Sequence, residues 1–394
     1  MWGLYASFGL VATSIAPLVP LIEADLGLSH AAMGSIMGAW QLVFIGAAIP
    51  CGMLLDHLGS RYALVIGVLL VAASSVARSF ADDYWALLLS VMVFGLGGPI
   101  VSAGAPKVVM RWFEGPSRGL AMGLYTTGPA IGGVVSLTLT HSVFLPLLGD
   151  WREVMRLWGW VGVGASVFWF LVSSLPAARA ADPKEEHGES LPQLAITKQL
   201  LALPALRVLL AIGVGAFLLN HGLANWLPEL LHAGGMSTVE AGYWAAIPTL
   251  VGILSSLLIP RLATPARRFT ILLLLIAAAC GATLLLQLEH RGVLFTGLFL
   301  QGVARSSLLT VLVLTLVELP GIGERRVGTA SGLFFSAAEI GGVLGPLGLG
   351  ILYDLSGGFS AALGFLTLTT AALAVGVVQL RNMSGRETTI PLAD

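Results

Sequence analysis

Twelve long apolar runs, separated by short polar turns, constrain this 394-residue chain more than any other feature. Each run is about long enough to cross a hydrocarbon core of roughly 30 Å, and none alternates like a barrel strand. In lipid, only a helix or a closed barrel satisfies the backbone. The pattern therefore predicts an all-α integral membrane protein with twelve transmembrane helices. We expect them near residues 2–22, 31–55, 61–79, 84–112, 116–146, 153–175, 205–231, 238–262, 268–288, 292–318, 326–353 and 358–380.

The composition supports this class and excludes others. Charged residues make up 10% of the chain, against about 25% in soluble proteins, so there is too little polar surface to face water. No phosphate-binding loop, metal-ligand spacing or His-Glu-x-x-His motif occurs, and Gly115–Gly119 matches a nucleophile elbow only by chance. We expect no catalytic residue, metal, cofactor or nucleic-acid partner, and free thiols at Cys51 and Cys280.

The lysines and arginines predict the orientation in the lipid bilayer. If the N-terminus is cytoplasmic and the helices alternate, fourteen of these residues fall on the cytoplasmic side and four on the other. This bias follows the positive-inside rule. We therefore expect a multi-pass protein of a bacterial-type plasma (inner) membrane, with both termini in the cytoplasm.

Two halves are visible in the sequence. Residues 117–134 and 326–343 align at an offset of 209 with eight identities in 18 positions, including Gly132 with Gly341. Such an internal repeat is typical of transporters. We expect six-helix bundles at 1–176 and 205–382, which would be pseudo-symmetric. Between and after them we expect a cytoplasmic linker at 177–204 and a cytoplasmic tail at 383–394.

The segment after the second apolar run resembles the loop 2–3 signature of the major facilitator superfamily. Four positions match it: Gly52, Asp56, Gly59 and Arg61. Two depart from it, because His57 and Ser60 stand where basic residues are usual. The resemblance extends over essentially the whole chain. It implies the two-bundle fold, alternating access and a gating role for the four matching residues. Gly59 would permit a tight turn, while Asp56 and Arg61 would pair with neighbouring helix ends.

Further motifs resemble branches of the superfamily. Gly128–Gly133 is similar to an antiporter signature, although these small residues are also explained by close helix packing. Asn225–Pro228 and the segment from Ala330 to Gly357 resemble the cyanate/nitroimidazole permease branch. The monocarboxylate and oxalate–formate branch remains open. Both of the latter branches imply small anions as substrates.

Three charged residues fall deep inside the apolar runs: Lys107, Arg305 and Glu339. A charge near the bilayer centre costs about 2.5–3.5 kcal/mol and therefore usually serves a site or an ion pair. Arg305 suits an oxyanion, and the resemblance places its helix beside a central cavity. Glu339 could carry a coupling proton, since a low dielectric favours a neutral carboxyl group. An internal Arg305–Glu339 pair is the alternative. Lys107 would line the inner mouth of the cavity or extend to the interface.

Five uncharged or weakly basic side chains complete the candidate substrate site. Asn220, His221 and Asn225 lie in one run, and His221 and Asn225 share a helix face at a spacing of four residues. Hydrogen bonds between helices explain these three residues equally well. Gln41 and Tyr125 are weaker candidates.

These observations predict a secondary active transporter for a small organic or inorganic anion, such as a carboxylate or a cyanate-like ion. We expect coupling to protons or a counter-substrate, and a monomer. Within the class, the alternative is a proton-coupled antiporter that exports drug-like compounds. Outside it, the alternatives are a receptor that does not transport and a membrane enzyme, because a fold alone does not fix function.

Overall fold

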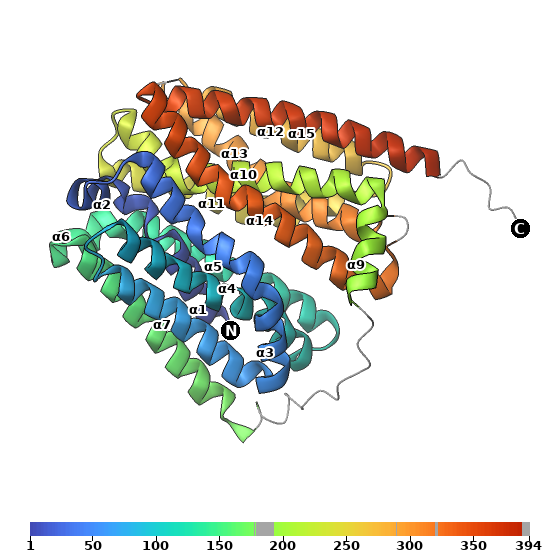
Figure 1. Cartoon of the computed structure of the whole chain (residues 1–394), viewed down its shortest axis with the longest axis horizontal. Helices are drawn as coiled ribbons and strands as arrows, with labels where there is room; N and C mark the ends of the chain where they lie inside the picture. Colours follow the sequence, from blue (N-terminus) through green and yellow to red (C-terminus); the bar gives the residue numbers. More distant parts are fainter. Residues whose placement is uncertain (177, 179–192, 289, 320–321, 388–394) are drawn as a thin grey trace, which may run out of the picture. The chain divides into compact units, whose positions relative to one another are not determined.

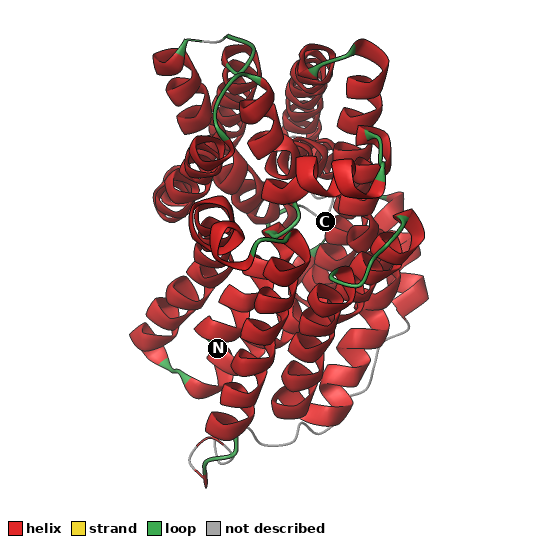
Figure 2. Cartoon of the chain, turned by 90° about the vertical axis from the view of Figure 1, so that its left-hand side faces the viewer, coloured by secondary structure: helices red, strands yellow, loops and turns green. Residues whose placement is uncertain are grey.

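The computed structural model describes residues 1–176, 178, 193–288, 290–319 and 322–387. In this part of the chain helices are joined by short turns and no strand occurs (Figures 1 and 2). Eleven helical segments within it are long and apolar enough to cross a membrane. The elements are α1 (Trp2–Thr13), η1 (Ala16–Leu18), α2 (Val19–Leu26), α3 (His30–Arg78), α4 (Tyr84–Trp112), α5 (Gly115–Leu139), η2 (Thr140–Phe144), α6 (Leu145–Leu148), α7 (Trp151–Ser173), α9 (Gln193–Ala202), α10 (Pro204–Ala233), α11 (Thr238–Leu262), α12 (Arg268–Leu285), α13 (Arg291–Val317), α14 (Gly323–Ser356) and α15 (Phe359–Glu387).

The chain forms two compact units. The first unit comprises Met1–Glu186 and Ala224–Thr249, and the second comprises His187–Leu223 and Leu250–Asp394. Of the predicted linker, residues 177 and 179–192 lie outside the described residues, while Gln193–Ala202 forms α9. Of the predicted tail, α15 extends through Glu387 and the remainder lies outside the described residues.

Helix α3 contains two of the twelve predicted spans but is one continuous segment, and for this reason eleven membrane-capable segments are found and not twelve. At 49 residues it is far longer than one crossing needs, and its helical geometry is interrupted at Gly59, with φ 74° and ψ 162°. This left-handed conformation is readily available to glycine alone. The predicted loop between the second and third spans is therefore reduced to a break at one residue. When α3 is divided at this break, the described residues contain twelve spans, as the sequence predicts.

The first span is also interrupted. Pro17 and Pro20 lack the amide hydrogens that a continuous helix needs, and a 3₁₀ turn, η1, separates α1 from α2. Arg78, at the end of α3, donates to the carbonyl oxygen of Val11 at 3.1 Å and to Ser14 Oγ at 3.2 Å. Its side chain is buried, with 1% of its surface exposed. Arg78 thus donates a hydrogen bond to a backbone carbonyl group at the point where the first span is interrupted.

The first unit has its core between α1, α3, α4 and α7. Leu4, Leu64, Val101 and Trp169, one from each of these helices, belong to one buried cluster. At the end of α5 the helix widens into a π-helical turn, η2, where His141 Nε2 lies 2.6 Å from the Pro17 carbonyl oxygen. The turn joins α5 to the interrupted part of the first span.

Glycines bring helices into backbone contact in both units. A Cβ atom at Gly132 in α5 would overlap the carbonyl oxygen of Ala6 in α1, and one at Gly341 in α14 would overlap that of Val214 in α10. These glycines are partners in the sequence repeat. The close approach explains the small residues of the predicted antiporter signature as helix packing.

Candidate functional site

A small cavity in the second unit is lined by Arg305 and residues of three helices. Arg305 and Gln301 lie one turn apart on α13, α10 contributes Asn220 and Phe217, and α12 contributes Thr283. The remaining lining residues are all alanine or leucine. The volume of about 30 Å³ accommodates one or two groups of the size of a water molecule. The structure thus brings together two of the predicted site residues, Asn220 and Arg305.

Several polar groups of this cavity lack partners. Among the described residues, Arg305 takes part in no ion pair, and neither Gln301 Nε2 nor Gln301 Oε1 has a hydrogen-bond partner. Gln301 is only 4% exposed. Asn220 Oδ1 is likewise buried without a partner. A buried polar atom left unsatisfied costs about 1–3 kcal/mol, so these three amide atoms are a costly feature of the packing around Arg305.

Glu339 lies in α14 and does not line this cavity. Its side chain is 6% exposed, and Oε2 has no hydrogen-bond partner within the part of the chain that the structure describes. No ion pair joins it to Arg305 in that part. The alternative prediction, an internal Arg305–Glu339 pair, is therefore not what the structure shows.

The other predicted substrate residues are distributed between the units. His221 lies beside Phe217, with 5.4 Å between the ring centroids, and Phe217 lines the cavity. Asn225, Tyr125 and Gln41 belong to the first unit. There Tyr125 is buried with its ring 5.6 Å from that of Tyr5, and Gln41 is fully buried in α3.

The predicted gating segment makes polar contacts with neighbouring helices of the first unit. Asp56 Oδ1 lies 2.8 Å from Lys107 Nζ in α4, so Lys107 extends to a carboxylate next to the helix break. Arg61 donates to Ser174 Oγ at the end of α7, and its guanidinium lies 4.9 Å from the ring centroid of Phe170. Gly52 lies inside α3 with open space where a Cβ would be. Asp56 and Arg61 thus contact neighbouring helices.

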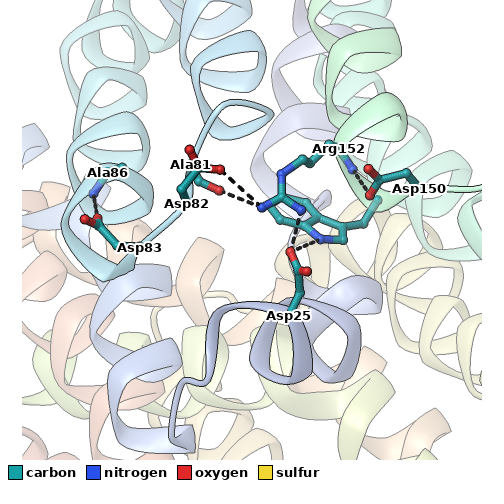
Figure 3. Close-up of polar contacts among 8 residues, drawn as sticks. Asp25, Ala81, Asp82, Asp83, Ala86, Asp150 and Arg152 are labelled. Carbon is teal, nitrogen blue, oxygen red and sulfur yellow. Dashed lines mark hydrogen bonds and ion pairs between the residues drawn. The ribbon is translucent and has the colours of Figure 1, made fainter.

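A second polar cluster joins three elements at another place in the first unit (Figure 3). Arg152, near the start of α7, forms ion pairs with Asp25 at the end of α2 and with Asp82 before α4. It also donates to the Ala81 carbonyl oxygen at 3.0 Å. Asp150 caps α7 through the amide of Arg152 at 3.0 Å. These contacts fasten helix ends together and leave no unpaired arginine there.

The sequence did not predict the burial of three polar residues, Arg78, Glu229 and Gln301. Arg78 and Glu229 lie at or near helix ends, where a sequence predicts solvent exposure, yet both are buried, and Glu229 Oε2 has no partner among the described residues. Gln301 is neutral and so does not stand out in an apolar run. Its spacing of four residues from Arg305 was the available signal, because residues four apart share a helix face.

Comparisons with known proteins place these features in context. The family model described as Major Facilitator Superfamily matches residues 1–346. A Bacillus subtilis protein named as the uncharacterized transporter YycB is 24% identical over 347 residues, which are 87% of this chain and 82% of that protein. The cyanate transport protein CynX of Escherichia coli is 26% identical over 376 residues, covering 92% of this chain and 91% of CynX.

Two further similarities extend this picture. The hexuronate transporter of Bacillus subtilis is 23% identical over 379 residues, covering 89% of this chain and 85% of that protein. Among solved structures, the nucleoside transporter NupG superposes with a TM-score of 0.80 at 12% identity, covering 96% of this chain and 98% of NupG. At that identity the superposition concerns the fold alone.

Proposed function

The chain belongs to the major facilitator superfamily, and we propose that it is a secondary active transporter of a small organic or inorganic anion. Family membership and the many membrane-capable helices make it an integral membrane transporter of a small molecule and not an enzyme. The anionic substrate, the coupling and the transport mechanism are the content of the proposal.

The observation that carries the proposal is the unpaired guanidinium of Arg305 at a cavity inside the second unit. A cation in a membrane-spanning helix is costly, and without a protein carboxylate it gains most from an anionic ligand. Its planar fork suits a carboxylate or a similar oxyanion. The names of two relatives, which specify cyanate and hexuronate, both denote anions.

Other predicted residues take supporting roles in this proposal. Asn220 and His221 from α10 would contribute polar contacts to the substrate, while Asn225, Gln41 and Tyr125 belong to the first unit and stay predictions from the sequence. Glu339 would carry the coupling proton, because its carboxyl group is buried with an unpartnered oxygen. Gly52, Asp56, Gly59 and Arg61 would form a gate as the two halves rock in alternating access.

The proposed setting is a bacterial-type inner membrane with both termini cytoplasmic, which the distribution of lysine and arginine supports. The proposed protein acts as a monomer that meets lipid, substrate and either protons or a counter-substrate. Export of drug-like compounds by antiport is a weaker alternative, because Gly128 and Gly132 are already needed for contact with the backbone of α1.

A thermal-shift screen of small anions tests the proposal. Wild-type protein in detergent should be stabilised by a carboxylate or cyanate, by about 2.7 kcal/mol at a ligand concentration of one hundred times Kd. Arg305→Ala should lose the response, because charge-assisted hydrogen bonds to the anion are removed. Arg261→Ala, which removes an exposed arginine of the same unit, is the matched control and should respond like wild type.

Two results would contradict the proposal. If wild-type protein responds only to cationic or apolar compounds, the substrate is not an anion. If an anion binds but does not cross the membrane of reconstituted vesicles, the chain is a receptor that has kept the fold. Equal losses in Arg305→Ala and Arg261→Ala would remove the specific role of Arg305.

A further inference from the structure

We propose that His30 and Trp226 form a pH-sensitive latch, which holds residues 224–249 against the first half of the chain when the imidazole is protonated. The predicted orientation places both residues toward the outer side of the membrane. This inference rests on the alternating access of the proposed function, because a latch needs two halves that separate. It adds a control of that movement by external pH.

Residues 224–249 belong to the second half of the sequence but pack within the first compact unit. Backbone takes part in this packing, since a Cβ atom at Gly242 in α11 would lie 2.3 Å from the carbonyl oxygen of Leu137 in α5. In alternating access the two halves of the sequence move relative to each other. The contacts that residues 224–249 make with the first half therefore have to break when the outer side opens.

His30, the first residue of α3, lies at this packing contact. Its ring is stacked on the ring of Trp226 in α10, with the centroids 5.2 Å apart and an angle of 5° between the planes. Trp226 is fully buried. His30 Nδ1 lies 3.4 Å from Glu23 Oε2 in α2, and the two side chains are 15% and 12% exposed. The imidazole thus contacts an indole of one half and a carboxylate of the other.

Both neighbours interact more strongly with a protonated imidazole than with a neutral one. A cation is attracted to the face of an indole, and it forms an ion pair with a carboxylate. Opening separates His30 from Trp226, so the first attraction is lost. Glu23 belongs to the same half as His30 and stays beside it, but water then screens the two charges. Protonation of His30 therefore stabilises the closed contact more than the open one.

Two further carboxylates lie on the elements that pack against His30. Glu229 follows Trp226 by three residues on α10, and its Oε2 is buried without a partner among the described residues. A negative charge there favours a cation nearby. Asp25 on α2 is already paired with Arg152 and contributes less. These groups act in the same direction as Glu23.

Two histidines oppose this effect. His141 in η2 and His232 near the end of α10 repel each other when both are charged, which would weaken the contact in acid. In each of them one ring nitrogen lies close to a carbonyl oxygen, at 2.6 Å from Pro17 for His141 and at 2.8 Å from Met236 for His232. The direction of the pH effect therefore separates the latch from this repulsion.

A cysteine at position 246 tests the latch. Ala246 is 2% exposed and lies four residues after Gly242 on the same face of α11, so a water-soluble maleimide reaches it when the contact opens. The full-length protein carries Ala246→Cys with Cys51→Ala and Cys280→Ala. It is labelled at about pH 5.5 and at about pH 8, on either side of the usual titration of histidine. Each rate is divided by that of His30→Gln in the same background and at the same pH, which cancels the pH dependence of the thiol.

We expect this ratio to be about two- to fivefold lower at the acidic pH, which is the effect of one cation–π contact at a partly exposed site. Glu23→Gln should reduce the pH effect without abolishing it, because the stack on Trp226 remains. His290→Gln removes an exposed histidine of the second unit and should be labelled like wild type at both pH values. If His30→Gln does not fold, a cysteine at Val239, which is 37% exposed on the same helix, supplies the reference rate.

Three results overturn the inference. Equal ratios at the two pH values would show that the contact does not respond to His30. A higher ratio in acid would mean that repulsion between His141 and His232 governs the contact. A cysteine that stays unlabelled under all conditions would show that residues 224–249 do not move away. The labelling uses no substrate, so anion binding at Arg305 succeeds or fails separately in the thermal-shift screen.

Discussion

Helices α5 and α14 occupy corresponding places in the sequence repeat, and they agree in their glycines but differ in one charge. Gly132 in α5 lies against the backbone of α1, where a Cβ atom would be 2.7 Å from Leu10 N. Gly341 in α14 makes the same approach to α10, with 2.8 Å to Leu218 N. Two positions earlier in each helix, the first half has Ala130 and the second has Glu339.

A similar contrast holds for the charges deeper in each half. In the first unit, Lys107 is paired with Asp56, and the buried guanidinium of Arg78 binds backbone. In the second unit, neither Arg305 nor Glu339 forms an ion pair with any described residue. The two halves thus share the glycines that bring their helices together, whereas the candidate binding and proton-coupling residues lie at positions where the halves differ.

The largest loss of stability is expected at the glycines that the two halves share. Gly132→Ala and Gly341→Ala place a Cβ atom on a neighbouring carbonyl oxygen, so the two helices must separate. We expect each substitution to destabilise the protein by about 1–3 kcal/mol or more, as overpacking does. Thermal unfolding in detergent, followed by tryptophan fluorescence and size-exclusion chromatography, measures this loss.

The repeat also provides the control. Gly123 and Gly332 are partners at the same offset, and neither has an atom within 4 Å of its would-be Cβ. Gly123→Ala and Gly332→Ala should be neutral or stabilising by up to about 1 kcal/mol, since alanine favours the helix. Equal stability of Gly132→Ala and Gly123→Ala would show that the close contact does not matter.

The sequence predicted most of this architecture because lipid leaves few choices for an apolar run. Twelve spans, the break at Gly59 and the matched glycines of the repeat all follow from hydropathy, turn chemistry and internal similarity. The interruption near Pro17 was not predicted, because the residue that stabilises it, Arg78, is distant in the chain. The helix α9 was missed because its ten residues are too few to cross a membrane and follow a polar stretch that predicts a linker.

The candidate site was predicted only in part. Arg305 and Glu339 stand out because charge is rare inside a span. Gln301 did not stand out, and its importance follows from burial without a partner, which depends on the packing of α10, α12 and α13. Arg78 and Glu229 lie at or near helix ends in the sequence but inside the protein in the structure. The position of a polar residue near a helix end therefore does not show whether its side chain is exposed or buried.

An intermediate effect, on transport driven by a pH gradient, is expected at Glu339, whose repeat partner is Ala130. Glu339→Gln keeps the shape of the side chain but removes the proton-binding group. With one proton per substrate, wild type in proteoliposomes should accumulate substrate up to about tenfold per unit of imposed pH gradient, with the acidic side as the source. The variant should keep exchange at equal pH and lose this accumulation.

Glu229→Gln serves as the matched control, because Glu229 is also a buried carboxylate with an unpartnered oxygen. It should retain accumulation driven by the pH gradient. If Glu229→Gln loses accumulation and Glu339→Gln keeps it, the proton site has been assigned to the wrong glutamate. If neither variant changes the pH dependence, the chain does not couple transport to protons through these groups.

The smallest effect on stability is expected at the paired charges of the first half. Asp56 is 57% exposed and Lys107 is 17% exposed, so solvent screens their attraction. A double-mutant cycle with Asp56→Asn and Lys107→Met should give a coupling of about 0.2–1 kcal/mol, the same as for the exposed pair of Glu153 and Arg156 at 2.5 Å.

The two pairs should nevertheless differ in their effect on transport. A gate needs only a small free energy, since 1 kcal/mol changes the ratio of two conformations about fivefold. Asp56→Asn should therefore change the transport rate by a few fold, and Glu153→Gln should not. A coupling above about 2 kcal/mol for Asp56 and Lys107, or unchanged transport in Asp56→Asn, would make this pair a structural contact and remove it from the gate.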